Sequence, residues 1–297
     1  MSQTCSPSTQ RRYGLARVCR VWALPRSTVY LRQARASAPA PAAAKRGPKT
    51  AWSDAELIEK IRAVLTASPF LGEGHRKVWA RLRWLGIRTS KARVLRLMRE
   101  AKLLAPTRAG HAHGPAAHDG TIVTEMPDAV WGMDATSCLT RLEGTATVFV
   151  VVDHCASECI GLHAAKPGTR FEAVEPLRQG LHAIFGGYEA GIAIGLTARH
   201  DHGSQYVSDY FQDELTFLGI TSSPAFVREP EGNGVAERFI RTLKEQLLWV
   251  RTFDTVEELR LALLDFKDRY NREWLCERHG YQTPAAVRAA ATRRKAA

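Results

Sequence analysis

The first 105 residues of the chain place apolar side chains at helical spacing in two groups. Residues 13–33 carry apolar positions three to four apart on both sides of a turn at Pro25–Thr28, which predicts two short helices. In the second group, Ser53 and Glu56 match a capping box ahead of an apolar run. Further helices are expected over 75–85 and 90–104. Both groups are therefore predicted to be helix-turn-helix-like.

The pattern changes after about residue 126, where apolar and β-branched runs replace the helical spacing. Three consecutive runs separated by short polar connections predict a meander of strands. Helices and strands then alternate, which is typical of an α/β domain with a mixed sheet. The predicted strands cover 129–137, 145–154, 157–165, 191–201 and 220–226, and the predicted helices cover 170–185, 206–219, a run that follows Gly232-Asn233-Gly234, and 256–270, ahead of a polar tail.

Two low-complexity stretches divide the chain into segments. Residues 36–52 are rich in Ala and Pro, and residues 106–125 are rich in Gly, His, Pro and Ala, so both are expected to be linkers. The expected domains are a helix-turn-helix-like segment at 1–35, a helix-turn-helix-like DNA-binding domain at 53–105, a catalytic core at 126–250, and a C-terminal helix and tail at 251–297.

Charge is distributed unevenly between these segments. Residues 1–110 hold 23 Lys and Arg against 5 Asp and Glu, whereas the remainder holds 19 against 25. A basic first third favours a polyanionic partner such as nucleic acid. The six cysteines are scattered, which argues against a disulfide framework and for a reducing cytoplasm, and no run is long and apolar enough to span a membrane. No zinc-finger spacing is present.

The predicted helix at 90–104 carries most of the candidate DNA contacts in the basic third. Lys91, Arg93 and Arg96 lie among its apolar positions, and a helix of this kind can enter a major groove. The alternative is a small helical bundle with a solvated charged face.

Three carboxylates stand at positions where the predicted elements make them conspicuous. Asp134 lies inside the first apolar strand, where an unpaired charge is unfavourable. Asp201 ends the fourth strand and Glu237 lies in the first turns of a helix. Oxygen ligands without His or Cys suit Mg²⁺ or Mn²⁺, and two such ions can promote phosphodiester displacement. Taken singly, however, each residue is also explained as a cap, turn or helix-dipole residue.

Three short blocks carry a resemblance to a known family. "WGMDAT", "DHGSQY" and "GNGVAERFIRTLKEQ" resemble the signature blocks of the DDE transposase and integrase superfamily, above all the OrfB product of insertion sequences encoded in two overlapping frames. Thirty-five residues separate Asp201 from Glu237, and a basic residue, Lys244, stands seven positions beyond Glu237, as in that family. The similarity extends to "RVLRLMREAKLL" and "YNREWLCERHGYQTPAAV".

The resemblance implies an RNase H-like core that gathers Asp134, Asp201 and Glu237 around two Mg²⁺ (or Mn²⁺) ions. It implies a DNA transposase or integrase, a metal-dependent polynucleotidyl transferase that cuts an element end and joins the freed 3′-hydroxyl to target DNA. Helical spacing places Arg241 and Lys244 on the Glu237 face, so both are expected to contact phosphate, although i,i+4 charge pairing would also explain them.

Other expectations follow from the same family. The partners would be terminal inverted repeats, target DNA, further copies of this chain and an upstream-frame (OrfA) product, in a bacterial cytoplasm near the nucleoid. The chain lacks the His-His-Cys-Cys module of retroviral integrases and a leucine-heptad segment. Asp153, on the adjacent strand, is the alternative catalytic carboxylate if Asp134 has a structural role.

Two rival functions stay open: a DNA-binding protein without catalysis, such as an inactive or domesticated transposase, and an RNase H-type nuclease that does not join strands.

Overall fold

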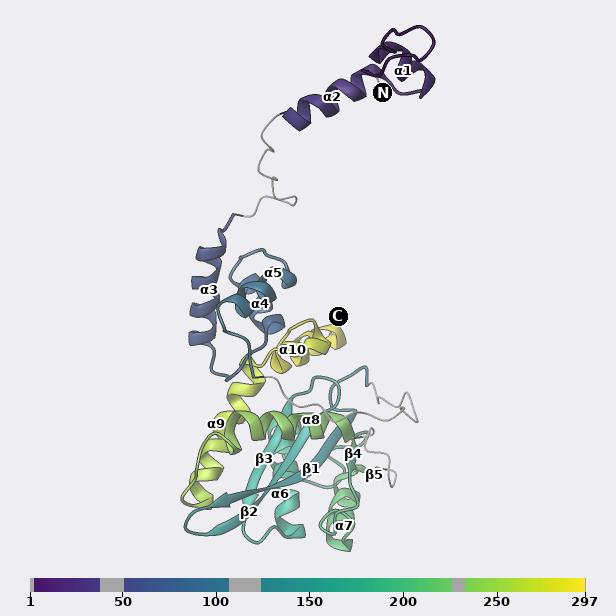
Figure 1. Ribbon diagram of the computed structural model, residues 1–297. Coiled ribbons are helices and arrows are strands. Elements are labelled where there is room, and N and C mark those ends of the chain that lie inside the picture. Colours follow the sequence, from purple (N-terminus) through teal and green to yellow (C-terminus); the bar gives the residue numbers. More distant parts are fainter. Residues whose placement is uncertain (1–2, 38–50, 107–123, 226–232, 297) are drawn as a thin grey trace. The chain divides into compact units, whose positions relative to one another are not determined.

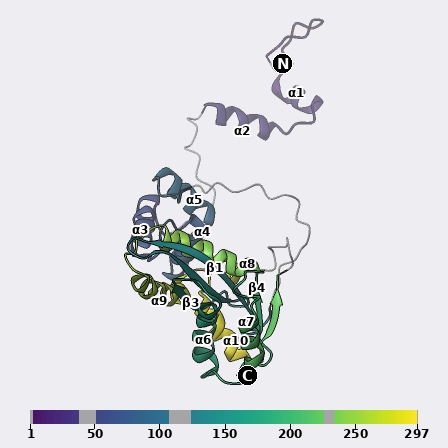
Figure 2. The same cartoon turned by 90° about the horizontal axis from the view of Figure 1, so that it is seen from below.

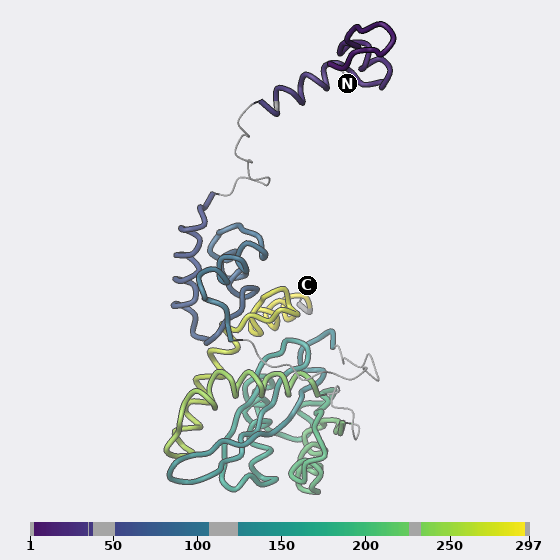
Figure 3. Tube along the Cα trace, in the orientation of Figure 1, coloured from purple at the N-terminus to yellow at the C-terminus, as the bar shows by residue number. Residues whose placement is uncertain are grey.

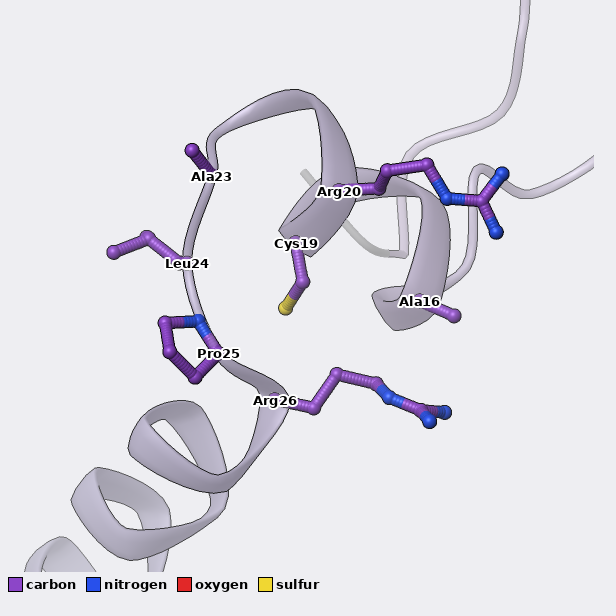
Figure 4. A pocket seen from close by; sticks show the side chains of 7 residues that line it. All are labelled: Ala16, Cys19, Arg20, Ala23, Leu24, Pro25 and Arg26. Carbon is purple, nitrogen blue, oxygen red and sulfur yellow. The ribbon is translucent and has the colours of Figure 1, made fainter.

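Two helices form the first of the two units into which the chain divides, Met1–Ala51 and Trp52–Ala297. The computed structural model describes residues 3–37, 51–106, 124–225 and 233–296 (Figure 1). Helices α1 (Leu15–Val21) and α2 (Arg26–Ser37) confirm the predicted pair. Cys19 is the one buried apolar residue of this unit's described part, and its thiol points into a small hollow at the turn (Figure 4). The hollow is lined by Ala16, Cys19, Arg20, Ala23, Leu24, Pro25 and Arg26.

Three helices open the second unit, as predicted: α3 (Asp54–Ala67), α4 (His75–Trp84) and α5 (Lys91–Glu100). The capping box forms, because the Glu56 N–H donates to Ser53 Oγ at 3.2 Å and the Ser53 N–H donates to the Glu56 carboxylate at 2.8 Å. The three helices share one hydrophobic core, made of Leu57, Ile61, Val64, Val78, Leu82, Ile87, Val94, Leu97 and Met98.

A five-stranded mixed sheet forms the centre of the rest of this unit. Its strands are β1 (Val130–Thr140), β2 (Gly144–Asp153), β3 (Cys159–Ala165), β4 (Thr197–His200) and β5 (Thr221–Pro224), in the order β3-β2-β1-β4-β5. The first three pair antiparallel, β4 runs parallel to β1, and β5 runs parallel to β4. β1 therefore lies at the middle of the sheet, between the meander and the parallel strands.

Helices cover both faces of the sheet (Figures 1 and 2). One hydrophobic core joins the sheet to α6 (Arg170–Phe185) and α7 (Asp209–Leu218), and another joins the opposite face to α8 (Gly234–Leu243) and α9 (Val256–Glu273). Figure 3 shows α8 crossing the sheet at β1 and β2, and both strands contact this helix. The architecture is the predicted RNase H-like α/β fold preceded by an all-helical region.

The fourth strand is shorter than predicted. We expected a strand over 191–201, but residues 191–195 form turns and β4 begins at Thr197. Gly191 and Gly195 adopt φ values of +71° and +96°, which strand geometry does not allow. Of the apolar residues in this stretch only Ala193 is buried, whereas Ile194 is 83% exposed, so the apolar pattern wrongly predicted a strand here.

The end of the chain also differs from the prediction of a polar tail. A short 3₁₀ turn, η3 (Glu277–His279), precedes α10 (Pro284–Ala296). Arg288 on α10 donates two hydrogen bonds to Asp128, at 2.6 and 2.9 Å, and pairs with Glu158. These partly buried ion pairs explain why an Ala- and Arg-rich segment with little apolar periodicity packs as a helix.

The closing segment also contacts the three-helix region. Leu275 and Tyr281 form a small apolar cluster with Ala80, and Tyr281 packs edge-on against Trp79. Arg81 forms a bidentate pair with the buried Glu73 carboxylate.

The predicted linkers fall largely on 38–50 and 107–123, outside the described residues. Within the described residues no helix has the length and apolarity needed to cross a bilayer.

Candidate active site

Asp134 lies on the central strand, on the face that α8 covers. It pairs with Val150 in β2, and Val150 belongs to the core on the α8 side. One carboxylate oxygen accepts a hydrogen bond from the Ala135 N–H at 2.7 Å. Burial, together with the negative charges of Asp201 and Glu237, raises the pKa of this carboxyl to about 6, opposed by the Ala135 hydrogen bond and by the charge of Lys244. Asp134 is therefore a half-buried acid whose ionised form lacks a full set of partners.

Asp201 and Glu237 approach Asp134 from two other elements. Asp201 directly follows β4, and its carboxylate accepts the Gly203 N–H at 2.9 Å in a local turn. Glu237 lies in the first turn of α8, near solvent, and partial desolvation raises its pKa. Both carboxylates act electrostatically on Asp134. Within the described residues, however, no three His, Cys, Asp or Glu side chains form a group able to hold a metal ion.

Asp153, the sequence alternative to Asp134, is fully buried at the end of β2. Its two carboxylate oxygens accept the N–H groups of Ala156 at 2.6 Å and Asp128 at 2.8 Å. Burial raises the pKa of Asp153 to about 6, against the effect of these hydrogen bonds. Asp153 thus holds the turn after β2 and the chain entering β1, which is a structural task.

Lys244 and Arg241, the two predicted phosphate contacts, have different surroundings. Arg241 is exposed and pairs with Glu245 at 3.1 Å, the i,i+4 arrangement that would also explain its presence. Lys244 begins a π-helical turn, η2 (Lys244–Leu248), and its charge lowers the pKa of Asp134. π-Turns inside α-helices are frequent at functional sites. Lys244 therefore belongs electrostatically to the carboxylate site.

The three predicted DNA contacts of α5 already have partners inside the protein. Arg93 is largely buried, and its guanidinium donates to the Asp54 carboxylate and to the Trp52 carbonyl. Arg96 pairs with Asp54 and Glu100 at the surface. The Lys91 ammonium lies 4.5 Å from the centre of the Trp79 ring. Arg93 is thus fixed in the three-helix core, whereas Lys91 and Arg96 stay at the surface.

A buried polar group beside Asp134 was not predicted as part of the site. Asn233, at the start of α8, donates to the Met133 carbonyl at 2.9 Å. His154 is 1% exposed, and burial and two nearby arginines lower its pKa to about 4. The sequence pattern places Asn233 only in a turn and His154 only at the end of a strand. The signal that could have identified them is a polar side chain at a position where the packing of α8 against the sheet requires burial.

Comparison with known proteins gives two family matches and a set of curated relatives. A model described as an HTH-like domain matches residues 52–111, and one described as an integrase core domain matches residues 218–284. The transposase for insertion sequence element IS629 of Shigella sonnei is 28% identical over 221 residues, which cover 71% of this chain and 72% of that protein. Transposase InsD for insertion element IS2D of Escherichia coli (strain K12) is 25% identical over 238 residues, or 78% of this chain and 77% of that protein.

Among solved structures, retroviral integrase cores are similar. The catalytic core domain of BIV integrase matches with a TM-score of 0.43 and 20% identity, covering 57% of this chain and 99% of that one. The HTLV-2 integrase catalytic core domain in complex with magnesium matches with a TM-score of 0.42 and 18% identity, over 55% of this chain and 98% of that one. The family models and the curated relatives confirm the resemblance inferred from the sequence blocks. The chain carries an HTH-like domain and an integrase core domain, and it resembles the transposases of insertion sequences.

Proposed function

We propose that this chain is a DNA transposase that cuts the ends of an insertion sequence and transfers the freed strand to target DNA. Asp134, Asp201 and Glu237 would be its catalytic carboxylates. The observation that carries the proposal is the position of Asp134, a half-buried acid on the central strand that experiences the charge of the other two. The three carboxylates belong to three separate elements, β1, the turn after β4 and α8, and the charges of Asp201 and Glu237 act on Asp134.

The carboxylates suit a hard divalent cation. Asp134 is poorly solvated and repelled by two like charges, which makes its ionised form unfavourable without a counter-ion. All three side chains offer the oxygen ligands that Mg²⁺ or Mn²⁺ prefers. We infer that Asp134, Asp201 and Glu237 hold two such ions, which when bound would polarise the phosphodiester and lower the pKa of an attacking oxygen.

Basic residues of the chain would orient the DNA around these carboxylates. Lys244 lies close enough to Asp134 to shift its pKa, so a phosphate at the site would lie within reach of its ammonium. Arg241, one turn away on an exposed part of the helix, would contact the neighbouring backbone once its pair with Glu245 opens. Lys91 and Arg96 would bind DNA from the HTH-like domain, at the surface of α5.

Further copies of the chain are expected on DNA, because a transposase must hold two element ends together. We propose that the working form is a homo-oligomer assembled on terminal inverted repeats, with an upstream-frame product as a possible partner. The site would then act on DNA that other copies help to position.

Incubation of the protein with labelled DNA that carries the element ends tests the proposal. Wild-type protein with Mg²⁺ should nick the DNA and then join strands, and Asp201→Asn should do neither. Asp213→Asn, an exposed aspartate on α7, is the matched control and should behave as wild type. Nicking without joining would support a nuclease instead, and binding without any metal-dependent cleavage would leave a DNA-binding protein without catalysis.

A further inference from the structure

Asn233 occupies the N-cap position of α8 but does not cap that helix. The side chain of an N-cap asparagine usually accepts a hydrogen bond from a backbone N–H of the first helical turn. The side chain of Asn233 makes no such bond. Instead the side chain, in a residue only 5% exposed, reaches the central strand and donates from Nδ2 to the Met133 carbonyl at 2.9 Å. The side chain of Asn233 thus forms a hydrogen bond to the sheet in place of an N-cap hydrogen bond.

The Met133 carbonyl lies where the pairing of β1 with β4 stops. The parallel ladder between these strands ends at the pair Gly132 and Arg199, and Met133 is the next residue. The Asn233 amide thus takes up a backbone acceptor just past the end of β4. A buried carbonyl without a partner is unfavourable, so this hydrogen bond is favoured.

The sheet also provides room for this side chain. A Cβ atom on Gly132 would lie 2.7 Å from Asn233 Oδ1 and 2.7 Å from His154 Nε2, closer than real Cβ contacts. Glycine at this position therefore lets both polar side chains rest on the strand. Asn233, His154 and Gly132 together form a close-packed polar contact between the start of α8 and β1.

This contact joins two proposed catalytic carboxylates through short, stiff paths. Met133 directly precedes Asp134 in β1, and Asn233 precedes Glu237 by four residues, about one helical turn. We propose that Asn233 is a positioning residue, which fixes the first turn of α8 against β1 and so sets the placement of Glu237 relative to Asp134. The inference rests on the proposed function of these two carboxylates.

Asn233→Asp is the sharpest test, because it keeps the shape of the side chain and removes the donor. Asn271→Asp is a matched control: Asn271 also donates to a strand carbonyl, that of Cys159 on β3 at 2.9 Å, two strands away from β1. Gly132→Ala displaces the Asn233 amide without changing Asn233 itself. All variants are compared as full-length protein at a temperature where circular dichroism shows them folded.

Three measurements separate positioning from general stability. Calorimetric titration with Mn²⁺ should show binding weaker by about 10- to 100-fold in Asn233→Asp and Gly132→Ala, the range for residues that orient metal ligands. Hydrogen exchange should speed up in the first turn of α8 and leave the rest of the core unchanged. For nicking of element-end DNA, kcat should fall by about 10- to 100-fold with KM for DNA unchanged, because displacement of a reacting group by about 1 Å has effects of this size. Asn271→Asp should match wild type in all three.

The outcomes distinguish this inference from the proposed function. Wild-type Mn²⁺ affinity and kcat in Asn233→Asp, beside an active wild-type protein, would overturn the positioning role alone. Equal losses in Asn233→Asp and Asn271→Asp would overturn it as well, since the effect would then be general. A wild-type protein that neither binds Mn²⁺ nor nicks DNA would overturn the proposed function, and the inference with it. If Asn233→Asp does not fold, hydrogen exchange and Mn²⁺ binding of Gly132→Ala decide the matter in the same terms.

Discussion

Replacing Asp134 by asparagine should stabilise the metal-free protein and remove its response to Mg²⁺. The pKa of the folded carboxyl is about 6, against 3.8 for the free side chain, and each unit is equivalent to about 1.4 kcal/mol. Because the folded pKa is raised, the ionised carboxylate destabilises the folded state: the effect is absent below about pH 3.8 and complete above about pH 6. Asparagine removes at most about 3 kcal/mol of this destabilisation.

Urea and thermal unfolding in EDTA measure the effect. At about pH 7.5 Asp134→Asn should raise the free energy of unfolding by up to about 3 kcal/mol and the melting temperature by about 6–12 °C, and at about pH 3 it should do neither. The Ala135 N–H keeps an acceptor in the asparagine, so no hydrogen bond is lost. With Mg²⁺ added in place of EDTA, the wild type should gain stability and the variant should not.

Two controls show whether the effect belongs to the site. Asp213→Asn, exposed on α7, should change the free energy of unfolding by less than about 0.5 kcal/mol at either pH. Asp153→Asn should destabilise the protein, because an amide nitrogen cannot accept one of the two N–H groups that Asp153 now accepts. An Asp134→Asn protein that is less stable than wild type at about pH 7.5 would refute the claim that an uncompensated charge resides at the site.

Three further predictions concern other residues. Lys244→Ala should lower the rate of nicking by about 10- to 100-fold while leaving DNA affinity within a fewfold of wild type, and gel-shift and single-turnover assays compare the two. Arg93→Ala should destabilise the HTH-like domain by about 1–3 kcal/mol, because Asp54 and the Trp52 carbonyl each lose the hydrogen bonds of this guanidinium, although Asp54 keeps its pair with Arg96; unchanged melting with weakened DNA binding would contradict this. Burial lowers the pKa of His154 to about 4, so the unfolded state binds the proton first as pH falls. The free energy of unfolding should therefore fall by about 3 kcal/mol between about pH 6.5 and pH 4. His154→Gln should flatten that part of the pH–stability curve, and an unchanged curve would contradict the burial argument.

The hydrophobic pattern predicted the strands and the helix that carry the three carboxylates, because each of these elements has a strong local sequence pattern. Asp134 stands in a β-branched and aromatic run, and the helix that carries Glu237 follows a Gly-Asn-Gly turn. These signals depend on neighbours within a few residues, so one sequence suffices to read them. The same holds for the capping box of Ser53 and Glu56, which forms as expected. Both the order of elements and the mixed sheet could therefore be predicted.

What could not be predicted depends on partners far away in the chain. Arg93 looks like a surface cation of a basic helix, and only the tertiary fold shows that Asp54 and the Trp52 carbonyl occupy its guanidinium. Asn233 looks like a turn residue, and its bond to Met133 spans a hundred positions of sequence. Apolar residues between Gly191 and Gly195 look like a strand, although the glycine backbone angles exclude one. Local propensity carries no information about such pairings.

The parallel pairing of β4 with β1 has a consequence for the order in which the protein matures. Residues joined by this ladder, such as Gly132 and Arg199, are far apart in the chain, so closing the loop between them is slow compared with forming helices and hairpins. The three-helix domain depends mostly on contacts between neighbouring segments and is expected to fold early. During synthesis, a nascent chain would then complete its three-helix domain well before β4 forms its ladder with β1. On the proposed function, the domain that binds DNA would be folded before the domain that cuts it.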